Sequence, residues 1–374
     1  MTDRKGIGDG GRPLKQMLED NERLYKETGC YAGITDPHLL KEDPVRAELF
    51  HSRIMAALIA GRETCRMVSG SPFVREVAEL CLGLFTPEGE NIVQSTGIQV
   101  HIKLMGDNIQ WMVRKNYEEE VGIHDGDFFI ANDPVISGMH AADVYDMLPI
   151  FHESELVGWV STVIMEMDIG AVSPGCMPTA NVERGTDGLK FLCERIGSND
   201  RLHRDFEHKI ENSLDMYHIF LLDRKGAMAA NIRVREEIKK IVGEFGLDFY
   251  KQATRELIEE EKCNQVARIK QRMIPGRYRN VVTAEFPMSK QPVAWIPAKV
   301  DTIRLIPMQM DILPEGRILL DFEGTGEWGW HAYNATPNAL WGGISVVTVQ
   351  TLSYDGRGNL GSLLPVDAKE PALD

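Results

Sequence analysis

The 374-residue sequence lacks long apolar runs, because no stretch approaches the roughly 20 apolar residues that a membrane-spanning helix needs. The N-terminal segment, from Met1 to Gly6, carries no apolar signal core. Basic residues are in deficit, since 41 Lys and Arg stand against 56 Asp and Glu and give a net charge of -15. Such a charge disfavours binding to nucleic acid or to an anionic membrane. We therefore expect a cytoplasmic protein with neither of these partners.

Cysteine is scarce and irregularly placed, and the six residues form no Cys-x-x-Cys pair, so neither a zinc cluster nor a disulfide framework is indicated. Mostly buried thiols are expected, and Cys176 alone lies beside a candidate site. The chain also lacks a phosphate-binding loop ending in Gly-Lys-Ser/Thr, and a Gly-x-Gly-x-x-Gly segment that opens a helix. The isolated chain is therefore predicted neither to bind nor to hydrolyse ATP.

What is present is the composition of an ordinary globular protein, with 43% hydrophobic and 26% charged residues. Its periodicity predicts a mixed α+β fold with N-terminal helices and hairpins, a central helical segment and a C-terminal β-rich region. We divide the chain into a flexible arm at 1–12, a mixed α/β region with the candidate site at 13–203, a helical segment at 204–275 and a β-rich region at 276–374.

Individual elements follow from the same patterns. Apolar positions at helical spacing predict helices at 13–29, 44–69 and about 105–118. Hairpins are expected between 79–85 and 91–94, and between 144–151 and 156–165. Strands are expected at 128–131, 278–286, 300–308 and 317–322. The segment 204–273 is expected to be helical, with breaks near 223–226 and 245–247.

The segment from His124 to Cys176 is the richest in residues that carry chemistry. Its strand at 128–131 must end at Pro134, since proline lacks a backbone donor and restricts the residue before it. The polar residues that follow therefore lie on a loop at a strand end. On that loop His140 and Asp143 are three residues apart, a spacing that lets an imidazole and a carboxylate bind one cation such as Mn, Zn or Fe.

If 144–151 pairs with 156–165, the loop after Met165 lies at the same end as His140. Asp168 is then a further ligand or a supporting partner. His101, in an apolar setting, is either a structural histidine or a ligand. The irregular segment 170–187 either covers a substrate or is a plain surface loop.

An aromatic group near the C-terminal end also leaves two interpretations open. Trp328, Trp330 and His331 follow a glycine-rich stretch. They either line an aromatic pocket or pack against the turn.

Taken together, short segments along nearly the whole chain resemble the hydantoinase B family, and within it most closely the alpha subunits of acetone carboxylases. Their order and spacing carry the resemblance more than any single segment does. The segments are Tyr31–Gly33, Glu79–Cys81, Ser95–Gly97, Val121–Asp125, His140–Asp143, Pro149–Phe151, Val157–Val160, Asp168–Ala171, Pro174–Gly175, Ile274–Gly276, Asp321–Gly324 and Trp328–His331.

The resemblance implies a subunit of an ATP-dependent, biotin-independent ketone carboxylase. A hydantoinase A-like subunit would use the ATP, and a small subunit would complete the assembly. The present subunit would join the activated ketone, an enol phosphate or enolate, to CO2 derived from bicarbonate. Subunits of this kind are much longer, which suggests that the region 276–374 is truncated. Relatives that act on acetophenone imply that an aromatic ketone is an alternative to acetone.

For the site, the resemblance implies that His140 and Asp143 bind Mn²⁺ or another divalent cation and act in catalysis, with His331 as a further catalytic candidate. The family's third ligand, a histidine, falls at Met165, and a thioether is a poor ligand for Mn²⁺. Either another side chain completes the site or the protein holds no manganese. The candidates are Glu166, Asp168 and His101.

Two other functions fit the same residues. One is a subunit of an ATP-dependent cyclic amide hydrolase of the hydantoinase or oxoprolinase type, in which the site activates water. The other is a non-catalytic scaffold paralogue, which the methionine at position 165 motivates. In each case we expect an obligate hetero-oligomer, since a chain without its activating subunit exposes partner surface.

Overall fold

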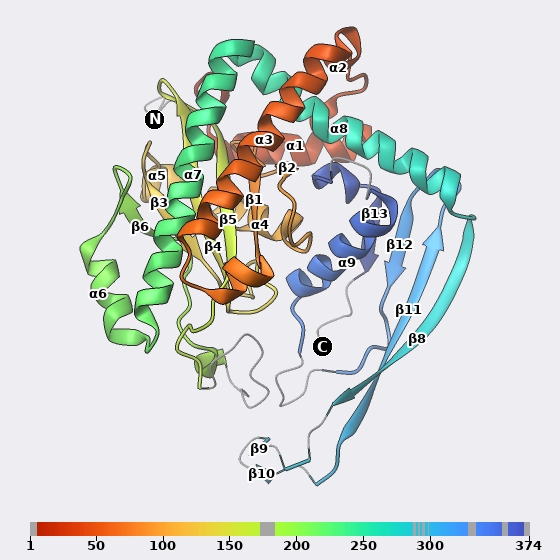
Figure 1. Ribbon diagram of the computed structural model, residues 1–374. Coiled ribbons are helices and arrows are strands. Elements are labelled where there is room, and N and C mark those ends of the chain that lie inside the picture. The colour runs from red at the N-terminus through yellow and green to blue at the C-terminus, as the bar shows by residue number, and fades with distance from the viewer. Residues whose placement is uncertain are drawn as a thin grey trace.

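A seven-stranded antiparallel sheet with the order β2-β1-β5-β4-β3-β6-β7 forms the centre of the molecule (Figure 1). The computed structural model describes residues 6–172, 184–286, 289–290, 292–293, 296–297, 299–327, 334–353 and 358–369. The strands of the sheet are β1 (Leu80–Phe85), β2 (Asn91–Gln94), β3 (Phe128–Ala131), β4 (Asp143–His152), β5 (Glu155–Met165), β6 (Glu194–Ser198) and β7 (Arg201–Leu202). Both expected hairpins, β1 with β2 and β4 with β5, are confirmed.

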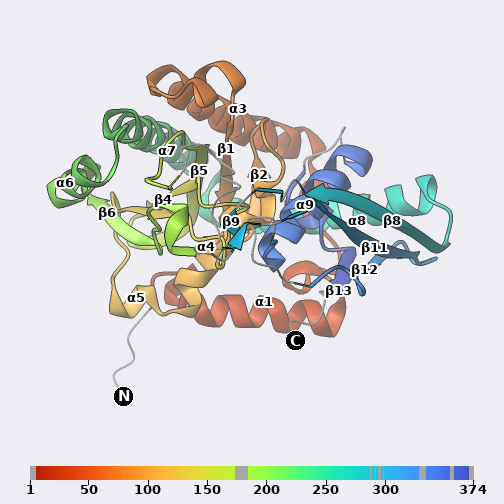
Figure 2. The same cartoon turned by 90° about the horizontal axis from the view of Figure 1, so that it is seen from below.

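Helices cover both faces of this sheet, as the view in Figure 2 shows most clearly. On one face α3 and α7 enclose the main core, and on the other face α1 and α4 enclose a second core. The helices of this part are α1 (Leu14–Thr28), α2 (Leu39–Glu42), α3 (Pro44–Val68), α4 (His101–Arg114), α5 (Tyr117–Glu120), α6 (Arg204–Ser213), α7 (Tyr217–Phe245) and α8 (Leu247–Arg272). Short helical turns are η1 (Asp9–Gly11), η2 (Tyr31–Gly33), η3 (Phe73–Val77) and η4 (Arg184–Asp187).

Strand alternation assigns each residue of β4 and β5 to one of the two cores. Val144 and its partner Ile164 pack in the main core, whereas the next pair, Tyr145 and Val163, packs in the second core. Asp143 is paired with Met165 and shares the face of Tyr145. The candidate site therefore lies on the side of the sheet that α4 covers.

Local sequence sets several helix ends. Asp43 precedes α3 and its side chain accepts a hydrogen bond from the Arg46 amide, while Pro44 occupies the first helical position. Helix α1 ends at Gly29, which adopts a left-handed conformation with φ of 69°. Between α7 and α8 the chain turns at Gly246, where φ is 90°. The break expected near 245–247 is therefore confirmed.

The break expected near 223–226 is wrong, because α7 runs without interruption from Tyr217 to Phe245. Two of the polar residues that suggested a turn, Asp223 and Arg224, are buried in this helix and bonded to neighbouring elements, whereas Lys225 is exposed. Asp223 accepts hydrogen bonds from the Ser69 hydroxyl and the Gly70 amide, at 2.5 and 2.8 Å. Gly226 lets α3 approach closely, since a Cβ there would lie 3.3 Å from the Cys65 carbonyl oxygen. Tertiary partners thus overrode a sequence typical of a turn.

Residues 6–12 are held against the body rather than free, although the sequence suggests a flexible arm. The Ile7 amide donates to Glu118 Oε1 at 2.6 Å, and the Leu156 amide donates to the Ile7 carbonyl at 2.7 Å. Asp9 pairs with Arg255 of α8 at 2.8 Å. These long-range bonds have no signature in the local sequence.

The C-terminal part forms a second sheet with the order β13-β12-β11-β8, next to a helix that the sequence analysis missed. Helix α9 (Pro337–Leu352) begins after Thr336, whose side chain accepts a hydrogen bond from the Ala339 amide at 3.2 Å. A threonine cap followed by proline was an available signal for this start. The other elements are β8 (Gly276–Phe286), β9 (Pro292–Val293), β10 (Ile296–Pro297), β11 (Thr302–Ile312), β12 (Ile318–Asp321), η5 (Leu360–Ser362) and β13 (Val366–Lys369).

Within the described ranges, the helices are each too short or too polar to cross a lipid bilayer.

Candidate functional site

The loop between β3 and β4 is fixed at its base by Asn132, which is fully buried. Its amide nitrogen donates to the carbonyl oxygens of Ala141 and Leu189, at 2.7 and 2.9 Å. Its side-chain oxygen accepts from the Phe191 amide at 2.7 Å. One side chain therefore ties both ends of this loop to the segment that precedes β6.

Four further contacts hold the rest of the loop. Asp133 accepts a hydrogen bond from the Val135 amide at 3.1 Å and pairs with Arg184. From α9, Asn338 donates to the carbonyl oxygens of Pro134 and Val135, at 3.3 and 3.2 Å. The loop is thus set by residues from widely separated parts of the chain, and α9 borders the site.

His140 and Asp143 face each other at the end of this loop. The distance from His140 Nε2 to Asp143 Oδ2 is 3.7 Å, too long for a hydrogen bond but short enough for an ion pair when the imidazole is protonated. The Asp143 side chain is buried, whereas that of His140 is 27% exposed and can meet a ligand. His140 Nδ1 is buried and has no hydrogen-bond partner among the described residues. The pair thus combines a buried carboxylate, which can accept a hydrogen bond, with an imidazole that a ligand can reach.

His101, the first residue of α4, packs beside this pair. It is buried, and its Nδ1 lies 3.0 Å from the Tyr145 hydroxyl. Burial lowers the pKa of His101, and the charge of Asp143 opposes this shift. Burial also raises the pKa of Tyr145 well above its usual value, with Asp143 adding to the effect. A neutral imidazole and a neutral phenol therefore line the inner side of the site.

Sequence reasoning missed Tyr145. A usable signal existed, because alternation along a strand places residues 143 and 145 on one face.

Two of the other candidate ligands have partners outside this cluster. The Glu166 carboxylate pairs with Arg224 of α7, on the opposite face of the sheet, and both side chains are buried. Asp168 accepts hydrogen bonds from the Gly170 amide at 2.8 Å and the Met216 amide at 3.2 Å. The second of these bonds holds the residue that precedes α7. Glu166 and Asp168 thus have structural partners of their own.

His331, Trp328, Trp330 and Cys176 lie outside the described residues. Their assignments as a catalytic candidate, an aromatic group and a nearby thiol remain predictions from the sequence.

Comparison with known proteins places this geometry in a family. A profile of the family described as hydantoinase B/oxoprolinase matches residues 43–372. The chain belongs to the hydantoinase B/oxoprolinase family.

Individual relatives agree with this membership. The chain is 37% identical over 370 residues to the acetone carboxylase alpha subunit of Xanthobacter autotrophicus, which covers 98% of this chain and 48% of the relative. It is 26% identical to the acetophenone carboxylase delta subunit of Aromatoleum aromaticum, covering 87% of this chain and 46% of the relative. A nucleotide-free structure of acetone carboxylase superposes with a TM-score of 0.93 at 36% identity, covering 97% of this chain and 48% of that one. The chain thus spans about half the length of these relatives.

The hydantoinase B resemblance implies a divalent cation bound at His140 and Asp143. His140 and Asp143 supply one imidazole and one carboxylate, and Met165 is paired opposite Asp143. No group of three His, Cys, Asp or Glu side chains suited to a metal ion occurs in the described part of the chain. A site that retains a divalent ion normally has at least three protein ligands. The described donor set therefore does not fit Mn²⁺.

Replacing Met165 by histidine is expected to create a manganese site. Residue 165 is the strand partner of Asp143, so a new imidazole would start from the backbone position opposite the carboxylate, in place of a methionine that packs against the main core. Bound manganese, measured after identical Mn²⁺ loading and desalting, should rise from negligible in the wild type toward one ion per chain. Met165→Leu is the matched control and should stay unloaded. Equal and negligible occupancy in wild type and Met165→His would show that the pair is not a latent manganese site.

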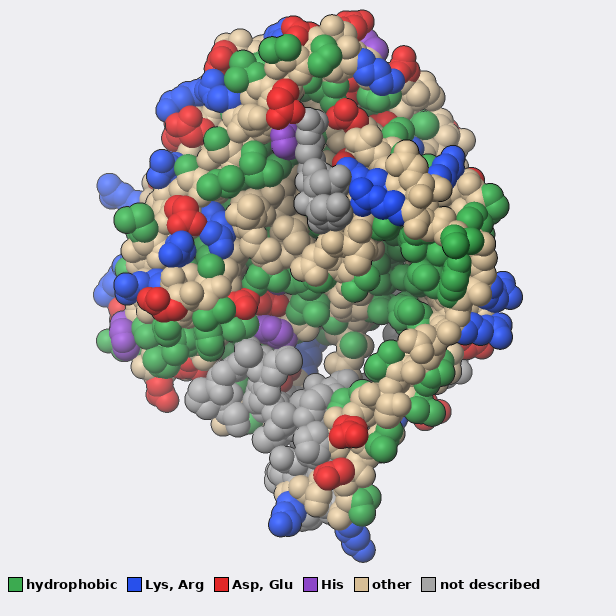
Figure 3. Space-filling view, turned by 45° about the vertical axis from the view of Figure 1, so that its right-hand side comes forward, with side chains coloured by type: hydrophobic (Ala, Val, Ile, Leu, Met, Phe, Trp, Pro, Cys, Tyr) green, Lys and Arg blue, Asp and Glu red, His purple; other side chains and the backbone are tan. Residues whose placement is uncertain are grey.

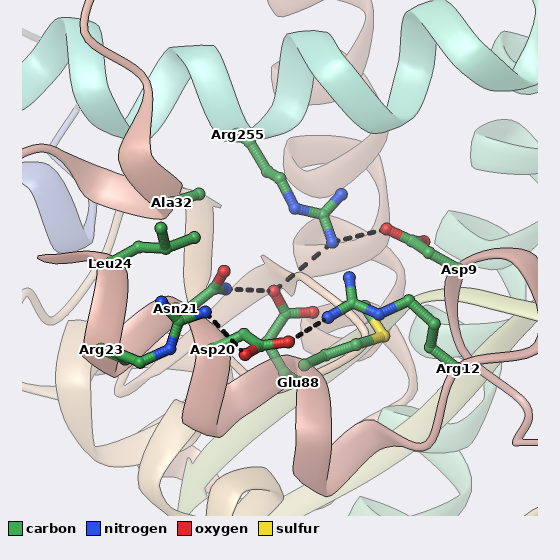
Figure 4. Close-up of a pocket in the computed structure, with 10 residues that line it drawn as sticks. Asp9, Arg12, Asp20, Asn21, Arg23, Leu24, Ala32, Glu88 and Arg255 are labelled. Carbon is green, nitrogen blue, oxygen red and sulfur yellow. Dashed lines mark hydrogen bonds and ion pairs between the residues drawn. The ribbon is translucent and has the colours of Figure 1, made fainter.

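A separate polar pocket lies between α1, α8 and the turn that joins β1 to β2 (Figure 4). Its volume is about 220 Å³. Each of the three arginines that line it is paired with a carboxylate: Arg12 with Asp20 at 2.6 Å, Arg23 with Asp20 at 3.0 Å, and Arg255 with Asp9 at 2.8 Å. Because these guanidinium groups are already neutralised, the pocket is a poor match for a nucleotide phosphate.

Beside this pocket, Glu90 is buried and accepts hydrogen bonds from the Tyr31 hydroxyl and the Asn21 amide. Burial, with the neighbouring charge of Glu88, raises the pKa of Glu90 to about 7. The folded protein thus holds this proton more tightly than the unfolded chain does. Its contribution to stability is complete below about pH 4.5 and is lost as the pH rises through 7.

Glu90→Gln is therefore expected to flatten the pH dependence of stability. Relative to the wild type, the variant should gain unfolding free energy between pH 4.5 and 7.5, on the order of 3 kcal/mol. Urea unfolding followed at several pH values measures this difference. Parallel curves for the two proteins would show that Glu90 does not titrate in this range.

Proposed function

We propose that the chain is part of an ATP-dependent, biotin-independent ketone carboxylase, in which it joins an enolised ketone to CO2 derived from bicarbonate. The observation that carries this proposal is the 37% identity with the acetone carboxylase alpha subunit, maintained over 98% of the chain. The site adds chemical support, because His140, Asp143 and the His101–Tyr145 pair gather at one end of the central sheet.

In this proposal His140 acts on the oxygen of the enolate. Held by the Asp143 carboxylate, the imidazolium donates a hydrogen bond to the enolate oxygen while the α-carbon of the enolate attacks the carbon of CO2. A carbon–carbon bond forms, and the enolate oxygen becomes the carbonyl oxygen of a β-keto acid. Tyr145 and His101 keep the inner wall neutral, so Asp143 carries the negative charge on that side.

The proposed partners follow from what the chain lacks. A hydantoinase A-like subunit would use ATP to activate the ketone, and a small subunit would complete a cytoplasmic hetero-oligomer. The closer match to the acetone enzyme favours a small aliphatic ketone, and the acetophenone relative makes an aromatic ketone the second candidate.

The test is to isolate the complex with its ATP-using subunit and to measure fixation of labelled bicarbonate. Incorporation that requires both ATP and a ketone is expected, and acetone compared with acetophenone identifies the ketone class. Hydrolysis of 5-oxoproline or hydantoin without bicarbonate fixation would favour the cyclic amide hydrolase, which the hydantoinase B/oxoprolinase family name also covers. Absence of both activities in an intact complex would favour the scaffold.

Because a separate subunit would use the ATP, this chain alone is expected not to bind it. Calorimetry with the purified chain and ATP-Mg²⁺ should detect no binding, since the sequence contains no phosphate-binding loop. Addition of the ATP-using subunit should restore ATP binding to the mixture. Tight binding to the chain alone would contradict the proposed arrangement.

A further inference from the structure

The strands β8 and β11 form a long arm that extends from the body of the molecule (Figure 1). They pair over eleven residues each, from Phe286 opposite Thr302 to Gly276 opposite Ile312. The order β13-β12-β11-β8 leaves β8 at the edge of its sheet. Every residue from Gly276 to Thr283 is exposed.

Both faces of this arm carry apolar side chains. On one face Tyr278 lies opposite Met310, and Val282 opposite Ile306. On the other face Ile303 and Leu305 project from β11, with exposed fractions of 61% and 56%. Figure 3 shows hydrophobic side chains along the arm and at the hollow where it leaves the body.

Among the described residues, a small third core covers the inner end of the arm, and the Glu327 carbonyl accepts a hydrogen bond from Arg304 farther along it. Met310 and Ile312 pack in a small third core with Ile344 and Leu352 of α9. The outer half of the arm is a two-stranded ribbon, and such ribbons are unstable in water without a further layer. Strand β8 contains neither proline nor lysine, and its charged residues Arg277, Arg279 and Glu285 lie toward its two ends, so the stretch from Asn280 to Ala284 is an uncharged part of the edge. Val281, Val282, Ile303 and Leu305 stay exposed on the arm, and an exposed apolar surface of this kind is typical of a protein–protein contact.

The relatives indicate what that polypeptide is. The solved acetone carboxylase chain superposes on 97% of this chain, so it must retain most or all of the arm, and 52% of that chain lies outside the match. The arm therefore occurs in relatives that carry about as much additional polypeptide. We propose that the arm is the docking surface for a polypeptide corresponding to the other half of those relatives, whose apolar strand adds to the free edge of β8. The surface serves this role whatever reaction the site performs.

A photo-crosslinking amino acid at position 281 or 303 tests the proposal in the complex isolated from cells that express the neighbouring subunits. Val281 and Ile303 are exposed and lie on the same face of the arm. Mass spectrometry should place the crosslinks on peptides that align with the other half of the acetone carboxylase alpha subunit. Those peptides belong either to this polypeptide or to a separate one, and either result supports the docking surface.

Position 45 provides the matched control, because Val45 is 79% exposed at the start of α3, away from the arm. A crosslinker there should not yield those peptides. Crosslinks from the arm to a second copy of this chain or to the ATP-using subunit would overturn the proposal. A complex that yields no crosslink from either arm position would also overturn it.

A variant that places positive charges on the arm tests the same docking surface without crosslinking. Where the docked polypeptide is a separate chain, the fraction of this chain that co-elutes with it should fall about tenfold or more in Ile303→Lys/Leu305→Lys. The thermal midpoint of the chain alone should change by less than about 2 °C, since both side chains are already exposed. Val45→Lys should leave co-elution unchanged. Unchanged co-elution with a separate polypeptide would contradict the proposal. Where the peptides belong to this polypeptide, an unchanged crosslink yield from position 281 in the double variant would contradict it.

Discussion

Asp143→Asn is expected to lower ketone-dependent bicarbonate fixation by about 10²- to 10⁴-fold, the usual contribution of a positioned acid–base pair. The asparagine keeps the size of the side chain but removes the charge that holds a protonated His140, whose Nε2 lies 3.7 Å from the carboxylate. His140→Gln should cause a loss of similar size, because it removes the other member of the pair. The double variant should lose little more than either single variant, since the two residues act as one unit.

Two measurements separate this effect from a loss of structure. The thermal midpoint of Asp143→Asn should stay close to that of the wild type, and Asp248→Asn, at an exposed position in the first turn of α8, should retain full activity. Activity of Asp143→Asn within about twofold of the wild type would remove the pair from the mechanism.

Arg224→Met is expected to destabilise the protein by about 3–5 kcal/mol, the usual cost of breaking a buried ion pair. Arg224 is fully buried between Asp146 and Glu166, and its loss would strand both carboxylates in the main core. Burial already raises the pKa of Asp146 to about 7 and that of Glu166 well above its usual value. Both carboxyl groups take up protons more readily at low pH. The loss of unfolding free energy in Arg224→Met should therefore be smaller at pH 5 than at pH 8.

The matched control for this variant is Arg204→Met, which removes an exposed arginine paired with Glu207 and should cost less than about 1 kcal/mol. Adding Glu166→Gln to Arg224→Met should restore part of the lost stability, because one stranded charge disappears. Urea unfolding at pH 5 and pH 8 measures all of these differences. A penalty for Arg224→Met that matches the Arg204→Met value would show that the buried triad is not required for stability.

Loss of Arg224 should also change the geometry of the candidate site. Glu166 follows Met165 directly, and its amide donates to the Ala142 carbonyl at 2.9 Å, next to Asp143. Movement of this strand end would change the position of the carboxylate relative to His140. The buried pair of Arg224 and Glu166 thus links the main core to the site on the opposite face of the sheet.

Sequence by itself determined the features that depend on neighbouring residues. Turn residues and alternation fixed both hairpins of the central sheet, and Asp43 with Pro44 fixed the start of α3. The spacing of His140 and Asp143 at a strand end also pointed to a site at this position, because residues three apart on a short loop remain close in any fold.

Only the tertiary structure decided which polar residues serve that site and which serve the core. Asp223 resembles a turn residue in the sequence, yet α7 continues through it because α3 supplies its hydrogen-bond partners. Glu166 resembles a ligand, yet Arg224 draws it to the opposite face, whereas His101 joins Tyr145 beside Asp143. The physical reason is that a buried charge or polar group takes whichever partner the packing brings near, and that partner lies 58 residues away for Glu166 and 154 residues away for the Asp223 bond to Ser69.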